Sequence, residues 1–429
     1  MNNNRRTDMS DSSPAVHFPE NRQHKRRLAV ILMTLAVDAL GIGIVLPVLP
    51  DLLREVAPQP PEAGMPLIGL FVSLYAFAQF LFAPLLGALS DAWGRRPVLL
   101  ATLFGTALSY ALVATAPSLG WLVAGIFLSG STAASTSAAS AYVADVTPEA
   151  QRAARFGLVS GVLGFGMVAG PAFGGLLGMI APRLPFVIAG SLAAVNAIAA
   201  MFVLNESLTK ENRRSFDWHR ANPLGSLKLL ATDGVLRRLV YASALGMVAY
   251  GIFLACFVLL NEMRLGWGPR ENGLALTGLG VGIIITQTWL LKMFVARCNE
   301  YRTAIIGYGL YTLAFIAYSL AVSPLIVAGA IALHALALIS DSTLRALISL
   351  RAGNERQGEY LGAQNCMLGL AITASPLLGA LLLHFSSRQE QSLYFQGIPF
   401  VIAVVVCLCA ILILLRGSQA DITLRNLYK

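Results

Sequence analysis

Long apolar runs separated by short polar segments repeat along the whole chain. A membrane-spanning helix needs about 20 predominantly apolar residues, and twelve runs meet this requirement. They cover residues 28–50, 66–88, 97–116, 119–144, 156–180, 184–204, 237–261, 271–294, 303–321, 324–349, 360–385 and 395–415. The pattern predicts an all-α polytopic membrane protein with twelve transmembrane helices, six in each half.

The longest internal polar segment, residues 206–236, lies between the two sets of six runs and is rich in basic residues. Such a segment is typical of a linker between domains. The expected organisation is a cytoplasmic tail over 1–27, an N-terminal bundle over 28–205, a cytoplasmic linker over 206–236, a C-terminal bundle over 237–416 and a cytoplasmic tail over 417–429.

Composition and charge agree with this picture. Of the 429 residues, 56% are hydrophobic and 12% are charged, whereas soluble domains carry roughly 25% charged residues. The net charge of +9 does not indicate nucleic-acid binding, because the basic residues lie between apolar runs and form no stripe with interleaved aromatics. Lys and Arg concentrate on one side of the predicted membrane, which places both termini in the cytoplasm. We expect the protein to lie in the inner membrane of a bacterium.

The loop over residues 87–100 is a tight, charged turn between two apolar runs. Asp91 precedes Arg95 by four residues, so the two side chains can pair, and Arg96 adds a second guanidinium. Gly94 marks a point where the backbone bends sharply. We interpret this loop as a cytoplasmic gate, because one or two charge-assisted contacts can bias a two-state element.

Asp38 lies midway along the first apolar run. A carboxylate at the bilayer centre costs about 2.5–3.5 kcal/mol on insertion scales, so it should face a cavity or a partner. Asp38 is the leading candidate for a proton or cation site. The alternative is a structural acid that is hydrogen-bonded beside Gly41, Gly43 and Pro47.

His334 and Asp341 are separated by about two helical turns in the tenth run, and Arg345 follows Asp341 by four residues. Histidine changes protonation near neutral pH, so His334 and Asp341 can form a proton relay. Alternatively, His334 is a packing residue and Asp341 neutralises Arg345.

Other polar side chains within apolar runs are candidates for lining a substrate cavity, or for holding neighbouring helices together. They are Gln79, Asn196, Tyr250, Thr286, Gln287, Arg345 and Asn365. The fifth run carries closely spaced glycines and one proline, a pattern that favours close helix packing or a hinge. These residues are Gly166, Gly170, Pro171, Gly174 and Gly175.

The two halves share a weak repeat. Gly170-Pro171-Ala172-Phe173-Gly174 matches Ser375-Pro376-Leu377-Leu378-Gly379 at an offset of 205 residues. The same offset places Asp91 on Ala296, where the acid and the glycine of the gate loop are absent. The repeat indicates a duplication, with the gate kept only in the N-terminal half.

These motifs together resemble the major facilitator superfamily, specifically the drug:proton antiporter branch that contains the tetracycline efflux proteins. Residues 38–55, 87–100 and 166–175 look like its first-helix, signature-loop and antiporter motifs. The resemblance implies two six-helix bundles that rock about a central site. It also implies that Asp91 and Arg95, with Asp145, lock the outward-facing state on the cytoplasmic side.

Four positions depart from the family pattern. Ala92 replaces a basic residue and Ile126 replaces an arginine, while Ile283 and Tyr311 stand where several tetracycline exporters have His and Asp. These departures argue against tetracycline itself as the substrate.

We therefore expect a secondary active transporter, not an enzyme, that exports a drug or an endogenous metabolite such as a siderophore by proton antiport. A proton-coupled importer and a non-transporting membrane sensor are the alternatives. The sequence has no nucleotide-binding loop and no Cys/His spacing for a metal. We expect a monomer in the lipid bilayer that binds a small-molecule substrate. It should draw its energy from the proton gradient and need no cofactor.

Overall fold

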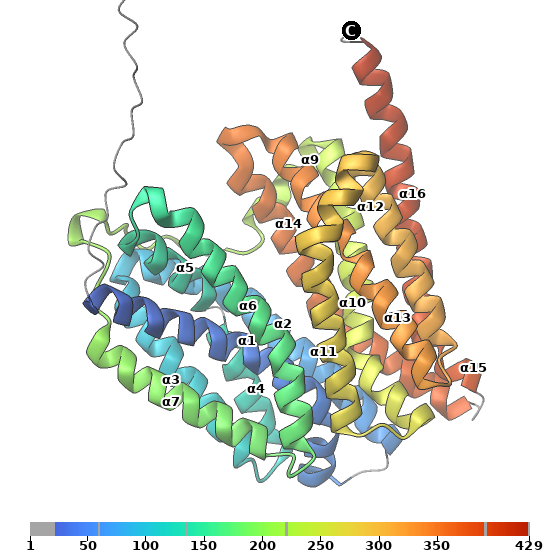
Figure 1. Ribbon diagram of the computed structural model, residues 1–429, viewed down its shortest axis with the longest axis horizontal. Coiled ribbons are helices and arrows are strands. Elements are labelled where there is room, and N and C mark those ends of the chain that lie inside the picture. The colour runs from blue at the N-terminus through green and yellow to red at the C-terminus, as the bar shows by residue number, and fades with distance from the viewer. Residues whose placement is uncertain (1–21, 59–60, 134, 219–221, 390–392, 428–429) are drawn as a thin grey trace, which may run out of the picture.

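The computed structural model describes residues 22–58, 61–133, 135–218, 222–389 and 393–427, and this part of the chain consists of helices and their connections (Figure 1). Most of the predicted N-terminal tail lies outside the described residues. The helices of the first half are α1 (Arg22–Val56), α2 (Pro61–Trp93), α3 (Arg95–Ala114), α4 (Leu119–Ala133), α5 (Ser135–Val146), α6 (Glu149–Gly178) and α7 (Leu184–Val203).

The second half begins after a connection that contains two short 3₁₀ helices, η1 (Lys210–Asn212) and η2 (Gly225–Lys228), and one turn of α-helix, α9 (Leu229–Thr232). A π-helical segment, η3 (Thr286–Leu290), joins α11 to α12. The longer helices are α10 (Gly234–Leu265), α11 (Pro269–Ile285), α12 (Leu291–Ser319), α13 (Pro324–Ala337), α14 (Ile339–Gln389) and α16 (Ile398–Leu427), with the short α15 (Leu393–Gln396) before the last.

Ten helices of the described residues are long and apolar enough to cross a membrane, and a bent pair, Arg26–Gly41 and Gly43–Val56, adds an eleventh candidate. One of the ten runs from Pro269 to Ser319, over 51 residues. At 1.5 Å per residue it is about 77 Å long, more than twice the thickness of a bilayer core. Its backbone breaks at Asn299, between the predicted runs 271–294 and 303–321. It therefore provides two crossings, and every predicted run overlaps a helix of this set.

Several helices are longer than the apolar runs from which they were predicted. The second predicted run, 66–88, lies within α2, which covers Pro61–Trp93. Helix α16 likewise continues beyond the last apolar run, through most of the predicted tail, to Leu427. A helix satisfies its own backbone hydrogen bonds and can continue into water, whereas hydropathy marks only the lipid-facing length.

The first helix bends by 40° between Gly41 and Gly43. A Cβ atom at Gly41 would lie 1.7 Å from the hydroxyl oxygen of Tyr110, and one at Gly43 would lie 2.5 Å from Cδ of Pro171. The absence of side chains at both positions lets α3 and α6 approach α1 closely. The second half repeats this packing, because Gly251 of α10 meets Ser375 and Pro376 of α14.

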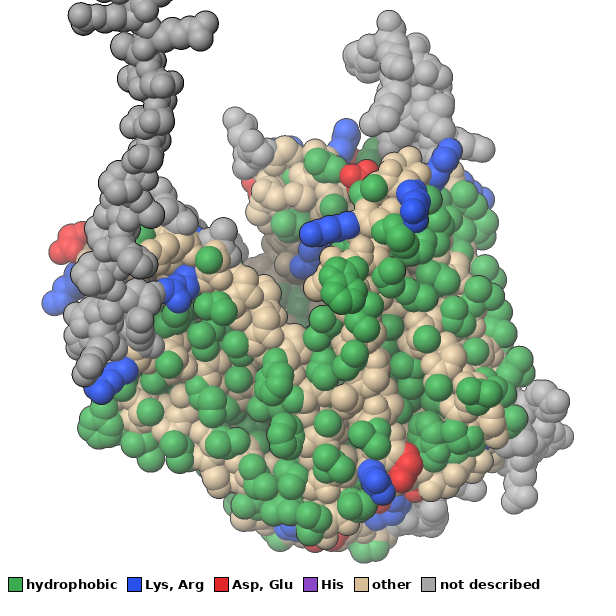
Figure 2. Space-filling model, viewed as in Figure 1, with side chains coloured by type: hydrophobic (Ala, Val, Ile, Leu, Met, Phe, Trp, Pro, Cys, Tyr) green, Lys and Arg blue, Asp and Glu red, His purple; other side chains and the backbone are tan. Residues whose placement is uncertain are grey.

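Helices α1–α7 form one bundle and α10–α16 form the other (Figure 1). They touch where α2 packs along α14 and α6 along α11. A recess separates the two bundles on the side where α16 ends, and they meet on the opposite side (Figure 2). We call these the C-terminal side and the far side. The recess leads toward the region where both bundles contribute side chains to one cavity.

Candidate functional site

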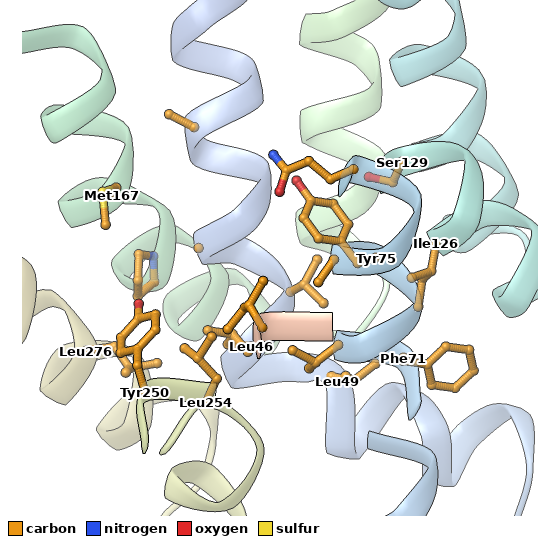
Figure 3. A pocket seen from close by; sticks show the side chains of 18 of the residues that line it. Leu46, Leu49, Phe71, Tyr75, Ile126, Ser129, Met167, Tyr250, Leu254 and Leu276 are labelled. Atoms are coloured by element: carbon orange, nitrogen blue, oxygen red, sulfur yellow. The ribbon is translucent and has the colours of Figure 1, made fainter. Parts of the chain in front are cut away.

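A cavity of about 400 Å³ lies between the two bundles (Figure 3). Helices α1, α2, α3, α4, α6 and α7 line it from the first bundle, and α10, α11 and α14 line it from the second. Most of its wall is aliphatic or aromatic. A volume of this size falls within the range that holds a drug-sized molecule.

Asp38 is buried beside this cavity, with 8% of its surface exposed. The hydroxyl group of Ser135, at the start of α5, donates a hydrogen bond to its carboxylate. The carboxylate is thus partnered, as a buried acid in a membrane span must be. It follows Val37 and precedes Ala39, and of these neighbours only Ala39 lines the cavity.

Two tyrosines connect Asp38 with the cavity. Tyr75 of α2 and Tyr110 of α3 both line the cavity, and both interact electrostatically with Asp38. Neither was predicted to line the cavity, although Tyr250, another tyrosine within an apolar run, was. Ser135 could have been found from its place in the Ser- and Ala-rich fourth run.

The predicted gate residues come together at the ends of α2 and α5 and the start of α3. Nη1 of Arg95 donates to Asp91 Oδ1 over 2.5 Å, and Nε of Arg95 donates to Asp145 Oδ2 over 3.3 Å. Gly94 has a φ of 109°, which glycine adopts without strain. Arg96 lies apart from this network and donates to the carbonyl of Met201. The Arg95 cluster is intact although the bundles are separated on this side.

A linker residue that the sequence analysis missed, Glu206, completes the cluster. Its carboxylate accepts from the backbone N–H of Arg95 over 2.8 Å and pairs with Arg213 over 3.8 Å. Ser207 donates to Asp145 over 3.0 Å, and the N–H of Arg214 donates to the carbonyl of Asp91 over 3.1 Å. The start of the linker is therefore bound to the gate loop of the first bundle.

His334 is fully buried within the second bundle. Five aromatic rings surround its imidazole at centroid distances of 4.5–6.1 Å. Neither ring nitrogen has a hydrogen-bond partner among the described residues. Two of the five rings, Tyr250 and Phe253, also line the cavity, so His334 lies directly behind the cavity wall.

Asp341 lies beside Tyr311, one of these five rings. The side chain of Tyr311 hydrogen-bonds to Asp341, and Arg345 interacts with the same carboxylate electrostatically. Tyr311 also packs edge-on against His334 at 5.2 Å. The structure thus brings His334 and Asp341 to one tyrosine, although α13 ends at Ala337 and α14 begins at Ile339.

The remaining predicted cavity residues divide into two groups. Gln79 and Tyr250 line the cavity. Asn196 does not; its side-chain amide donates to Thr34 Oγ1 over 2.9 Å and joins α7 to α1. Gln287 donates to the carbonyl of Leu338. Five of the seven residues expected at the cavity are therefore absent from its lining: Asn196, Thr286, Gln287, Arg345 and Asn365.

The predicted glycines of α6 lie at close helix contacts. Gly166 and Gly170 face Ala39 and Gly43 of α1, while Gly175 faces Gly273 of α11. Gly174 packs on Ile44, and Pro171 lines the cavity. Helix α6 therefore contacts both its own bundle and the opposite one.

The far side is held by a contact between the bundles. Nη2 of Arg54, on α1, donates to the carboxylate of Glu262, on α10. Nearby, the backbone N–H of Leu377 donates to Ser73 Oγ over 3.1 Å, which joins α14 to α2. These polar contacts close the cavity on the side opposite the recess.

The C-terminal side of the second bundle has its own acidic centre, Asp233. It caps α10 by accepting from the N–H groups of Val235 and Leu236, and it also contacts Arg351 over 3.2 Å and the hydroxyl of Tyr360 over 3.1 Å. Burial acts to raise the pKa of Asp233, but these hydrogen bonds and the arginine together hold it below its ordinary value. No cluster that could hold a metal ion occurs among the described residues.

The chain is similar in sequence to tetracycline resistance proteins. The tetracycline resistance protein of class C from Escherichia coli is 33% identical over 396 residues, which cover 92% of this chain and 98% of that protein. The class G protein from Vibrio anguillarum is 36% identical over 358 residues, covering 81% and 88% respectively.

The crystal structure of the human organic anion transporter MFSD10 (TETRAN) has the same fold, with a TM-score of 0.66 at 22% identity, covering 92% of this chain and 100% of that one. The family model described as Major Facilitator Superfamily matches residues 31–291 and 263–424. These matches extend over both bundles, and the chain belongs to the Major Facilitator Superfamily, a family of transporters and not of enzymes.

Proposed function

We propose that this protein exports a small organic molecule in exchange for protons, and that the cavity opens alternately to the two sides of the membrane. The observation that carries the proposal is the position of Asp38. It is a buried acid in a membrane span, bonded to Ser135, three residues before the helix bend at Gly41 and beside the cavity. The tetracycline resistance proteins to which the chain is similar support export of a drug.

Protonation is the step that couples the proton to the movement. A neutral Asp38 is less costly to expose to an apolar contact than a carboxylate, and its bond with Ser135 is weakened because the acceptor loses its charge. Both effects act on α1, which packs against α6 at Gly43. Protonation thus shifts the populations of the two open states, as a ligand does that prefers one of them. His334 and Asp341 are the second candidate pair for coupling.

The ends of the two bundles form the gates. On the C-terminal side, which we place in the cytoplasm with both termini, Arg95 organises Asp91 and Asp145. On the far side Arg54 and Glu262 join the bundles. The two bundles, 28–205 and 237–416, move as bodies joined by the linker 206–236, in the inner membrane of a bacterium. Since one chain forms the whole cavity, a monomer is sufficient for transport.

The alternatives have less support. The relatives give no support for siderophore export. An apolar cavity wall also does not match a molecule rich in charged oxygen ligands. A proton-coupled importer would use the same site with the opposite direction of net flux. A non-transporting sensor would bind its ligand without moving it.

The test is proton movement in proteoliposomes when a panel of drugs, beginning with tetracycline, is added to wild-type protein and to Asp38→Asn. We expect substrate-dependent proton flux in the wild type and a loss of at least tenfold in the variant. Glu359→Gln changes an exposed carboxylate with 60% of its side-chain surface accessible, and it should transport normally. Equal proton flux in Asp38→Asn would refute coupling at Asp38. Comparing vesicles of opposite orientation separates export from import, and binding without flux would indicate a sensor.

A further inference from the structure

Aromatic side chains from both bundles line the wall of the cavity. Six rings line it, and Met167 and Met247 add flexible, polarisable side chains. The rings are those of Phe71, Tyr75, Tyr110, Phe186, Tyr250 and Phe253. Aromatic faces stack well on flat rings, and methionine adapts to irregular outlines. The wall is therefore suited to a molecule with a flat ring system.

Among the described residues that line the cavity there is no Asp, Glu, Lys, Arg or His. Of the ionisable groups near it, Asp38 accepts from Ser135. His334 is separated from the cavity by the rings of Tyr250 and Phe253, against which it packs. An ion that entered would lose its hydration without gaining an oppositely charged side chain in the wall, at a cost of several kcal/mol. Cation–π contacts with the rings would return only about 0.5–2 kcal/mol to a cation. The wall selects against a formal charge of either sign.

Hydrogen-bonding side chains lie at both ends of the cavity, with more of them at one end. Gln79 follows Tyr75 by one helical turn on α2, so the two side chains share a face. Figure 3 shows Tyr75 and Ser129 at one end of the labelled set and Leu46, Leu49 and Leu254 at the other. A ligand that fills the cavity would find most hydrogen-bonding partners at the first end, and the hydroxyl of Tyr250 beside Leu254 at the second.

We propose that the transported molecule is a flat, largely apolar ring compound that carries no net charge while it is in the cavity, with most of its hydrogen-bonding groups at one end. This inference rests on the proposed function, because it names the class of molecule that the same cavity takes. It separates the substrate from the proton site: the ligand contacts Tyr75 and Tyr110, which line the cavity, whereas Asp38 does not line it.

The experiment uses three probes that share one ring skeleton: N-phenylnaphthylamine, which is neutral, its sulfonate, and its trimethylammonium derivative. Binding to purified full-length protein in detergent is measured by calorimetry, and proton movement is measured in proteoliposomes. We expect the neutral probe to bind at least tenfold more tightly than either ion. Equal or tighter binding of an ion, or no binding of the neutral probe, would overturn the inference.

Gln79→Glu provides a second measurement, because it adds a carboxylate at the polar end. It should increase affinity for the trimethylammonium probe about tenfold, whereas Gln79→Leu should not. If Gln79→Glu binds the neutral probe but gains nothing for the cation, position 79 does not contact the ligand and the inference fails. Proton flux driven by a charged probe would support the exporter and refute the neutral class. Binding of the neutral probe without proton flux would support the class and refute the antiporter.

Discussion

Gly94 and Asn299, which are 205 positions apart, have closely similar and rare backbone conformations. Gly94 has φ 109° and ψ 160°, and Asn299 has φ 64° and ψ 170°. The same offset relates Pro171 to Pro376, each of which packs against a glycine of the first long helix in its own half, Gly43 or Gly251. The duplicated loop therefore kept its backbone turn in the second half after it lost the glycine and the acid.

Replacing Asn299 with glycine should stabilise the protein. A residue with a Cβ atom in this region of φ and ψ costs about 1–3 kcal/mol of backbone strain. The N–H of Arg302 donates a capping hydrogen bond to Asn299 Oδ1, and losing such a cap costs only about a few tenths of a kcal/mol when glycine is the replacement. We expect the free energy of unfolding, measured by thermal unfolding of the purified protein, to rise by about 1 kcal/mol. Asn299→Ala loses the cap and keeps the strain, so it should be less stable than wild type. An alanine variant as stable as wild type would contradict this account.

Gly43→Ala should destabilise the contact between α1 and α6. The added methyl carbon would lie 2.5 Å from Cδ of Pro171 and 2.8 Å from Cα of Gly170, and overpacking of this kind costs about 1–3 kcal/mol. A Cβ at Gly161 would meet nothing within 4 Å, so Gly161→Ala is the matched control and should be neutral or slightly stabilising. The temperature of thermal unfolding and the transport rate should both be lower in Gly43→Ala than in the wild type. Equal behaviour of the two variants would show that this contact is not tight.

Breaking the pair between Arg54 and Glu262 should favour opening of the far side. The two side chains are 41% and 33% exposed, so their interaction contributes about 0–1 kcal/mol, enough for up to a fivefold change in populations. Spin labels at Ala57 and Arg270 should report a longer distance in Arg54→Ala and in Glu262→Ala. The exchanged pair, Arg54→Glu with Glu262→Arg, should restore the shorter distance. If it does not, charge pairing is not what closes this side.

Arg95→Lys should reduce transport at least tenfold despite conserving the charge. The guanidinium contacts Asp91, Asp145 and Ser90 from three directions, and a single ammonium group cannot reproduce that geometry. The measurement is the initial rate of substrate-driven proton flux at matched protein levels. Arg302→Lys, at an exposed arginine, serves as the control and should behave as wild type. Full activity of Arg95→Lys would mean that charge alone is required.

Asp233 makes the stability of the second bundle depend on pH. Its pKa is lowered in the folded protein, so its stabilising effect is present above the ordinary carboxyl pKa of about 4 and is lost as the pH falls through the lowered value. Asp233→Asn keeps an oxygen for capping but loses the charge toward Arg351. The variant should unfold at a lower temperature than wild type at pH 7, and the difference should shrink at acid pH. A constant difference would exclude protonation of Asp233 as the cause.

The sequence by itself determined the class of fold and the position of the main elements. Apolar runs of about 20 residues identify crossings because lipid cannot satisfy backbone hydrogen bonds, so each run must be helical. Local spacing was sufficient to predict the pairing of Asp91 with Arg95, because the two are one helical turn apart and meet in the structure. The motifs were also sufficient for the family.

Only the tertiary structure decided which polar residues share a site. Asn196 and Gln79 look alike in the sequence, yet Asn196 bonds to Thr34 and Gln79 lines the cavity. Hydropathy marks a polar residue in a span but not the direction in which its side chain points, which depends on how each helix packs. For the same reason the bond from Ser135 to Asp38 and the place of Glu206 in the gate were not predicted. Contacts between residues distant in the chain are set by packing against neighbouring helices, and no local pattern encodes them.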